Sequence, residues 1–235
     1  MTPTSPTPFR EKHWAPYEAM RRIVAEQVRG MPRILEIGPG PVPFPPATEF
    51  VDWQAWPELA GKTVHTLDLN QDRLPFADKD FDFAYCRHTV EDLYNPVTLL
   101  REMSRVARAG YVETPSPVAE CTRGVDGVRG GQQWRGYIHH RYLTWVAGDT
   151  LHVIAKAPLI EHLEFGDEHE MVELLNLGPL YWNTYFFWAG ELKFRLLQHD
   201  VDFKLQSNYA ELLLRAMRES VDANVALAQK HGLPH

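Results

Sequence analysis

Short, largely apolar runs recur along the first half of the chain. Residues 33–37 (RILEI) are β-branched and apolar and stop at a glycine, and the other runs span 49–52, 63–68, 81–86 and 111–114. Runs of this length are typical of strands that are buried on both faces of a parallel sheet. We therefore expect each run to be a strand of one sheet.

Between and after these runs, apolar residues recur at helical spacing. This spacing predicts helices over residues 17–28, 95–107 and 209–230. The first helix is expected to end before Gly30 and the second before Gly110, because glycine readily adopts the conformation that follows a helix end.

Two pairs of runs in the second half indicate β-hairpins. Runs at 141–146 and 150–156 flank a short turn, as do runs at 181–188 and 192–197. We expect at least one hairpin to complete an edge of the sheet. Because strands and helices alternate before them, the chain is predicted to be an α/β protein whose ligands bind at the carboxyl ends of its strands.

The length of 235 residues and the hydrophobic content of 44% suit one sizeable core. We expect a single domain, residues 1–235, that begins with a disordered lead over 1–13. The glycine-rich segment 115–136 is expected to be a loop near the substrate, either a mobile lid or an ordinary surface loop. Residues 137–235 are expected to supply the hairpins and the C-terminal helix.

Composition limits the location and the partners. The lead lacks the basic start and apolar run of a secretion signal, and no stretch approaches the ~20 apolar residues of a membrane helix, so we expect a cytoplasmic protein that does not enter a membrane. The 31 acidic residues outnumber the 24 basic ones, and no basic run is present to follow phosphates, so nucleic acid is not expected as a partner. Cys86 and Cys121 lack a CxxC spacing and are expected to be reduced.

A candidate ligand loop follows the first predicted strand. Glu36 precedes the turn that contains Gly38 and Gly40, and in such an arrangement the glycines admit a ligand close to the backbone while the acid accepts from a charged amine. An ordinary Gly-Pro-Gly turn at a strand end is the alternative. A dinucleotide site is the weaker interpretation, because the third glycine of G-x-G-x-x-G is missing from the proline-rich stretch after Gly40.

Three motifs, in their order along the chain, resemble those of a known family. The chain reads LEIGPG at 35–40, LDLNQDRLPFADKDFD at 67–82 and LLREMSRVARAGYVETPSP at 99–117. In this order they resemble the class I S-adenosylmethionine-dependent methyltransferases with a type 11-like domain. The resemblance covers about residues 31–117, and it implies a Rossmann-like, mostly parallel sheet with an antiparallel edge hairpin, flanked by helices in a three-layer sandwich.

The resemblance also implies a cofactor, S-adenosyl-L-methionine, with S-adenosyl-L-homocysteine as the product. The residues implied to bind it are Glu36 at the methionine amine, Gly38 and Gly40 behind the cofactor, Asp52 at the ribose hydroxyls, and Asp68 with Leu69 at the adenine. Two alternatives remain open: Asp52 is a solvated turn acid, or Asp68 is the ribose acid and residues 49–52 are a loop. The chain departs from the family in its proline-rich turn and in having Asp92 where E-H-L is usual.

Methyl transfer is an in-line displacement, so the protein mainly aligns the reactants and, for a hydroxyl or amine acceptor, takes up a proton. His88, just beyond the fourth strand, is the favoured base, although a hydrogen bond to the cofactor or backbone is an equal interpretation. His139 is a weaker candidate. We expect no metal site, since adjacent His139 and His140 in an extended segment point to opposite faces.

Aromatic side chains crowd the run at 181–188. They line an acceptor pocket, form the interface of a homo-oligomer through the aromatic hairpin, or pack in the core at a sheet edge, and core packing is favoured. The predicted function is methyl transfer to a small-molecule acceptor, such as a sugar or natural-product intermediate, by analogy with similar proteins. The alternatives are an inactive binding or scaffold protein with this fold and an S-adenosylmethionine enzyme with different chemistry.

Overall fold

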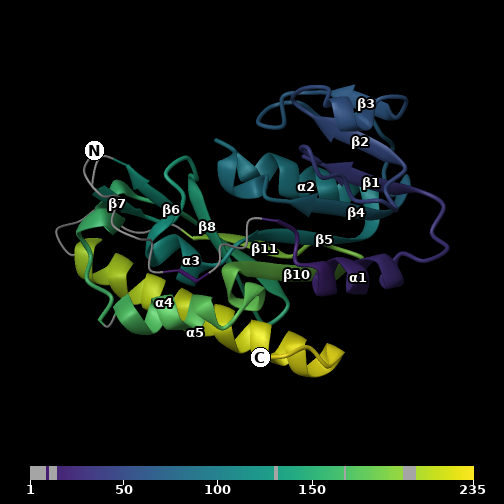
Figure 1. Ribbon diagram of the computed structural model, residues 1–235. Coiled ribbons are helices and arrows are strands. Elements are labelled where there is room, and N and C mark those ends of the chain that lie inside the picture. Colours follow the sequence, from purple (N-terminus) through teal and green to yellow (C-terminus); the bar gives the residue numbers. More distant parts are fainter. Residues whose placement is uncertain (1–8, 11–14, 130–131, 167, 198–204) are drawn as a thin grey trace.

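The computed structural model describes residues 9–10, 15–129, 132–166, 168–197 and 205–235. Its main sheet has six strands in the order β10-β5-β4-β1-β2-β3 (Figure 1). The strands are β1 (Ile34–Ile37), β2 (Glu49–Asp52), β3 (Thr63–Thr66), β4 (Phe81–Arg87), β5 (Ala107–Pro115) and β10 (Asn183–Ala189). All neighbours pair in parallel except β10 with β5, so the α/β prediction is confirmed.

Helices cover both faces of this sheet. Alternate residues of β4 point to opposite faces: Phe83 belongs to the core cluster that contains Met20 of α1 (Glu18–Gln27), and Cys86 to the cluster that contains Met103 of α2 (Pro96–Val106). The long C-terminal helix α5 (Leu205–His231) packs on the same side as α1. This arrangement gives the three layers that the resemblance implies, and both cysteines are buried and free.

A second, smaller sheet has the order β11-β9-β8. β8 (Tyr142–Ala147) and β9 (Thr150–Ala155) form the first predicted hairpin. The second predicted hairpin is wrong, because β10 joins β5 in the main sheet while β11 (Phe194–Leu197) pairs with β9. Burial explains the separation: β10 is buried along nearly its whole length, as suits a place in the main sheet, whereas β11 is half exposed. The antiparallel edge is therefore a single strand.

The segment 115–136 is not the predicted loop. It contains α3 (Pro117–Cys121) and a two-stranded sheet of β6 (Arg123–Arg129) and β7 (Gln132–Arg135). The hydroxyl of Ser116 caps α3 by accepting from the backbone N–H of Ala119 at 3.1 Å. The apolar side chains of α3 are buried against the rest of the chain, and this burial holds the segment in regular structure.

The remaining elements are short or lie near α5. They are η1 (Pro57–Leu59), η2 (Val90–Asp92), η3 (Pro158–His162), α4 (Glu168–Asn176) and η4 (Pro179–Trp182). α4 lies along α5 at the lower left of Figure 1. Among the helices within the described ranges, none has both the length and the apolarity that crossing a membrane requires.

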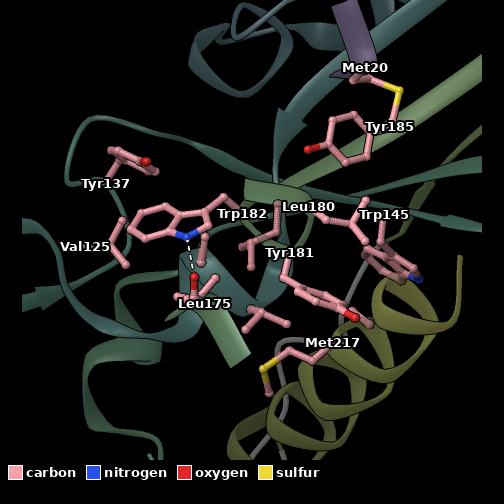
Figure 2. Packing of buried hydrophobic residues seen from close by; sticks show 14 of the residues in the cluster. Met20, Val125, Tyr137, Trp145, Leu175, Leu180, Tyr181, Trp182, Tyr185 and Met217 are labelled. Carbon is pink, nitrogen blue, oxygen red and sulfur yellow. Dashed lines mark hydrogen bonds between the residues drawn. The ribbon is translucent and has the colours of Figure 1, made fainter. Parts of the chain in front are cut away.

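The predicted aromatic cluster lies in the core (Figure 2). Tyr181, Trp182 and Tyr185 are each at most 6% exposed, and the indole N–H of Trp182 donates to the backbone oxygen of Leu175 at 2.8 Å. Because most of these aromatic side chains are buried inside one chain, they offer little surface for a subunit interface, and the homo-oligomer stays a prediction. Core packing, the favoured interpretation, is confirmed.

The predicted disordered lead over 1–13 is also wrong where the structure describes it. The ring of Phe9 packs edge-on against Trp182 with 5.3 Å between centroids, and Arg10 pairs with Glu173 at 3.3 Å. An apolar side chain that is 7% exposed gains enough from burial to order this part of the chain. Residues 1–8 and 11–13 lie outside the described residues.

Gly110 lies in the middle of β5, not at the predicted helix end. α2 ends at Val106 and the strand begins at once. A Cβ atom on Gly110 would lie 2.5 Å from the backbone oxygen of Ala84 and 2.6 Å from the Trp188 ring. Close packing of the indole against the strand therefore requires glycine here.

We predict that Gly110→Ala lowers the free energy of unfolding by about 1–3 kcal/mol, because the added methyl group must displace the indole or the neighbouring strand. Urea denaturation followed by circular dichroism measures the change. Arg108→Ala, an exposed position two residues away, is the control and should change stability by no more than about 0.5 kcal/mol. Equal effects of the two substitutions would contradict the proposed close packing.

Candidate functional site

A cavity of about 270 Å³ opens at the carboxyl ends of the central strands. Ile37 at the end of β1 pairs with Val51 of β2 on one side and with Cys86 of β4 on the other, so the segments that leave these strands converge. The lining residues are Gly38, Gly40, Asp52, Trp53, Trp56, Leu69, His88, Thr89, Asp92 and Leu93. A larger groove of about 380 Å³ between α4 and α5 is mainly apolar and lies away from these strand ends.

The glycine loop forms one wall. Gly38 and Gly40 have φ angles of +68° and +54°, which only glycine adopts without strain. A Cβ atom on Gly38 would lie 1.9 Å from the Thr89 hydroxyl, whereas one on Gly40 would meet nothing within 4 Å. Gly38 is thus needed for the contact between two loops, and Gly40 leaves open space for a ligand to approach the backbone.

Glu36 lies behind the loop and does not line the cavity. It is 2% exposed, and its Oε2 accepts from the backbone N–H of Phe44 at 2.8 Å. Burial raises the pKa of Glu36 to about 8, against the opposing effects of the Phe44 hydrogen bond and the Arg21 guanidinium. Arg21 donates to the backbone oxygen of Pro43. Glu36 therefore fixes the proline-rich turn, and its contact with a cofactor amine stays a prediction.

Asp52 ends β2 and faces the cavity. Its carboxylate accepts from the backbone N–H of Trp53 at 2.7 Å and from the indole N–H of Trp56 at 2.8 Å, and it is 3% exposed. Since residues 49–52 form a strand in the sheet, they are not the loop that the alternative interpretation required. The carboxylate is positioned at the end of the second strand, as the resemblance implies.

Of the two residues implied to contact the adenine, Asp68 and Leu69, only Leu69 lies at the cavity. Leu69 is buried and lines the cavity. Asp68 is exposed and is not among the lining residues; its carboxylate accepts from the backbone N–H of Asn70 at 3.0 Å and from the side-chain amide of Gln71 at 2.6 Å. These hydrogen bonds hold the pKa of Asp68 below its ordinary value. Its geometry is that of a residue that stabilises the turn.

His88 lies in the cavity wall with a φ angle of +48°. Its backbone N–H donates to the backbone oxygen of Glu113 at 2.8 Å, and Nε2 lies 3.0 Å from Oδ1 of Asn183. Burial, with smaller contributions from Arg87 and His140, holds the pKa of His88 well below its ordinary value. A neutral imidazole is the form that accepts a proton.

A buried charge pair supports this wall. The Arg87 guanidinium lies 3.0 Å from Glu113, and the hydroxyl of Tyr111 donates to the other oxygen of Glu113 at 2.6 Å. A hydrogen-bonded buried pair of this kind is costly to break at one partner. Arg87 and Glu113 thereby fix the end of β4, from which His88 projects.

Several lining residues were not singled out from the sequence as site residues. They are Trp53, Trp56, Thr89 and Leu93. Each follows the end of β2 or β4 within a few residues, and nearness to the carboxyl end of a parallel strand was the available signal. Which of these residues meet at the cavity depends on the order of the strands in the sheet, and that order cannot be predicted from any one apolar segment of the sequence.

His139 and His140 do not point to opposite faces as predicted. Residues 138–139 form a turn rather than the expected extended segment, and the ring centroids of the two histidines are 4.4 Å apart. Their Nε2 atoms lie 3.8 Å and 3.9 Å from Oδ1 of Asp92. His139 is half exposed and His140 is buried. The expectation that these two histidines cannot bind one metal ion, because their side chains point to opposite faces, is therefore wrong.

Residues 50–112 match a family model described as a methyltransferase domain. This segment is thus similar to the methyltransferase family, whose model covers less than half of the chain. The match runs from β2 to β5 and includes Asp52, Leu69 and His88. Members of this family take their methyl group from S-adenosylmethionine.

Several solved methyltransferase structures resemble this chain over part of its length. An S-adenosylmethionine-dependent methyltransferase from Mesorhizobium loti is 21% identical, with a TM-score of 0.37, over 45% of this chain and 56% of that one. A putative methyltransferase from Bacillus halodurans is 17% identical, with a TM-score of 0.32, over 40% and 50%. The chain thus spans about half the length of these structures. A search of curated proteins found no significant match.

We predict that the free energy of unfolding falls as pH rises from about 4.5 to about 8, in part because of Glu36. Folded Glu36, with its pKa near 8, retains a proton that the unfolded chain releases near 4.5, so the folded state is favoured at the acidic end of this window. Glu36→Gln keeps an acceptor for Phe44 and removes the titration. In this variant, the decrease in the free energy of unfolding over this pH range should be smaller than in the wild type by about 1 kcal/mol or more.

Denaturation with urea at pH 5.5 and pH 8 tests this. Glu26→Gln is the matched control, since Glu26 is exposed on α1, and it should leave the pH dependence unchanged. Parallel pH dependences for the wild type and Glu36→Gln would contradict the assignment.

Proposed function

We propose that the protein transfers the methyl group of S-adenosylmethionine to a small-molecule acceptor, such as a sugar or a natural-product intermediate. The observation that carries the proposal is the convergence of Gly38, Gly40, Asp52 and His88 on one cavity at the carboxyl ends of β1, β2 and β4. This is the position at which open parallel sheets bind their ligands. The match to the methyltransferase family model over 50–112 supports it.

The residues of the cavity suit the cofactor. The open space beside Gly40 admits a ligand to the loop backbone, the Asp52 carboxylate suits a pair of ribose hydroxyls, and the buried Leu69 offers an apolar surface to the adenine. The cofactor when bound supplies an electrophilic methyl group on a sulfonium. The volume of about 270 Å³ is close to the lower end of the range for ligand pockets, roughly 300 Å³.

The chain's own contribution is alignment and proton uptake. An in-line displacement requires the acceptor atom, the methyl carbon and the sulfur to be held in a line. Within this proposal, His88 removes the proton that a hydroxyl or amine acceptor loses. If Nε2–H donates to Oδ1 of Asn183, Nδ1 carries the free lone pair. Asn183 is buried and on the edge strand β10, and it orients the ring.

We predict that Asp52→Ala weakens binding of S-adenosylmethionine and S-adenosylhomocysteine by about 10-fold or more, because hydrogen bonds to a charged group contribute about 1.5–3 kcal/mol. Isothermal titration calorimetry gives the dissociation constants, and thermal melts confirm folding. Asp149→Ala, at an exposed turn of the smaller sheet, should bind as the wild type does. Wild-type protein that binds neither compound would overturn the proposed function.

Asp68→Ala separates two interpretations of the carboxylates. Because Asp68 is exposed and caps a turn, we expect its removal to change cofactor affinity less than that of Asp52. The same calorimetry measures it. A larger loss with Asp68→Ala than with Asp52→Ala would make Asp68 the principal cofactor carboxylate.

We also predict that His88→Asn lowers kcat by about 10²–10⁴-fold, the usual contribution of a general base, with cofactor affinity nearly unchanged. Asparagine tolerates a positive φ angle and so suits this position. Transfer of a tritiated methyl group to a panel of glycosides and phenols identifies an acceptor, on which kcat is then measured. An unchanged kcat would show that His88 only lines the site.

A further inference from the structure

We propose that Asp92, His139 and His140 form a binding site for a divalent transition-metal ion at the rim of the cavity. One ligand atom from each residue lies within 4.8 Å of the other two. Oδ1 of Asp92 is 3.8 Å from Nε2 of His139 and 3.9 Å from Nε2 of His140. Two imidazoles and a carboxylate are a ligand set that Zn²⁺ and Fe²⁺ favour.

The distances suit a shared ion better than direct contacts. Separations of 3.8 Å and 3.9 Å are too long for hydrogen bonds. Ligand atoms about 2.0–2.1 Å from a tetrahedral ion are roughly 3.4 Å apart. Each histidine therefore needs to approach the Asp92 carboxylate by only about half an ångström, and the two histidine ligand atoms already lie within 4.8 Å of each other.

Unsatisfied buried oxygens provide a second, independent observation. Within the described part of the chain, Oδ1 of Asp92 and both carboxyl oxygens of Glu91 are buried and have no hydrogen-bond partner. Glu91 is 1% exposed, and its strongest electrostatic neighbour is His140. Burying an unpaired carboxylate is strongly unfavourable. A cation held by Asp92 and the two histidines would give Oδ1 of Asp92 the partner that it lacks.

His140 is already oriented as a metal ligand. Its Nδ1 lies 2.6 Å from Oε1 of Glu120, and both side chains are at most 5% exposed. The other oxygen of Glu120 pairs with the Lys156 ammonium at 2.5 Å. A carboxylate that accepts from Nδ1–H fixes the tautomer in which Nε2 carries the lone pair, and this is the usual outer-shell partner of a metal-bound histidine.

The nearby cations do not oppose an ion here. Lys156 is paired with Glu120, and Arg87 is paired with Glu113. The Arg141 guanidinium donates to the backbone oxygen of Asp92 and lies 3.8 Å above the Tyr94 ring. Lys156 and Arg87 are thus bound to other acids, and none of the three cations donates a hydrogen bond to Oδ1 of Asp92 or to the Glu91 carboxylate.

The position gives the ion a role in the proposed function, on which this part of the inference rests. Asp92 lines the cavity together with His88, so an ion on Oδ1 lies at the cavity rim. Three protein ligands leave at least one coordination position for a ligand from outside. An acceptor hydroxyl bound there would have a lowered pKa and would lose its proton more readily. The inferred acceptor class is therefore one with a metal-binding hydroxyl.

The test uses full-length, tag-free protein after treatment with a chelator. Titration with Co²⁺, followed by visible absorption, and with Zn²⁺, followed by calorimetry, should show one equivalent bound. Asp92→Asn and His139→Ala alter accessible positions and should lower affinity at least 10-fold. His162→Ala, an exposed histidine of η3, is the matched control and should bind one equivalent as the wild type does.

Glu120→Gln adds a variant that leaves all three ligands intact. Loss of an outer-shell partner typically lowers metal affinity 10–100-fold, and thermal melts of each variant identify any that fail to fold. Absence of a bound equivalent in the wild type, or binding that Asp92→Asn and His139→Ala leave unchanged, would overturn the metal site.

Titration of the same samples with S-adenosylmethionine separates the two proposals. Metal binding without cofactor binding would leave the metal site standing and overturn the proposed methyl transfer. Cofactor binding without metal binding would overturn the metal site alone.

Discussion

The contact between Gly38 and Thr89 fixes the site, because it sets how closely the loop after β1 and the segment after β4 approach. A side chain at Gly38 would overlap the Thr89 hydroxyl. The parallel pairing of Ile37 with Val51 and with Cys86 holds the three strand ends level. Asp52 and His88 reach the same cavity only because these ends and loops are held together. The cavity is thus a consequence of strand register and of one close backbone approach.

Buried acids around this cavity fall into two groups. Glu113 and Glu120 are paired with Arg87 and Lys156, and they act as rigid supports. Glu36 and Glu91 are buried without a cationic partner in hydrogen-bond contact, and burial raises the pKa of each to about 8. With pKa values near 8, these two acids are mainly neutral at pH 7, and neither lines the cavity. A cation that binds close to either acid would favour its ionised form.

Much of the architecture could be predicted, since the information is local. The apolar runs and helical spacings gave β1 to β4, α1, α2 and α5 close to their observed bounds, whereas β5 begins at Ala107, four residues before the predicted run. Features that depend on distant partners could not. β10 and β11 separate into different sheets because of burial against β5 and β9, and Gly110 is explained by the ring of Trp188, which is far away in the sequence.

The candidate site shows the same limit. The strand ends indicated Gly38, Gly40 and His88, and the family resemblance implied Asp52 and Leu69; all of them line the cavity. Asp68 lies next to Leu69 in the sequence but outside the lining, because the turn that begins at Asp68 uses its carboxylate. His139 and His140 approach Asp92 because a turn at 138–139 replaces the expected extended segment. Side-chain direction in irregular segments depends on backbone angles that composition does not determine.

A crystal structure of the complex with S-adenosylhomocysteine tests the central claim most directly. The account predicts the ligand beside Gly38 and Gly40, with its ribose hydroxyls at Asp52 and its adenine against Leu69. A ligand bound instead in the groove between α4 and α5, or no ligand at concentrations that saturate class I methyltransferases, would contradict it.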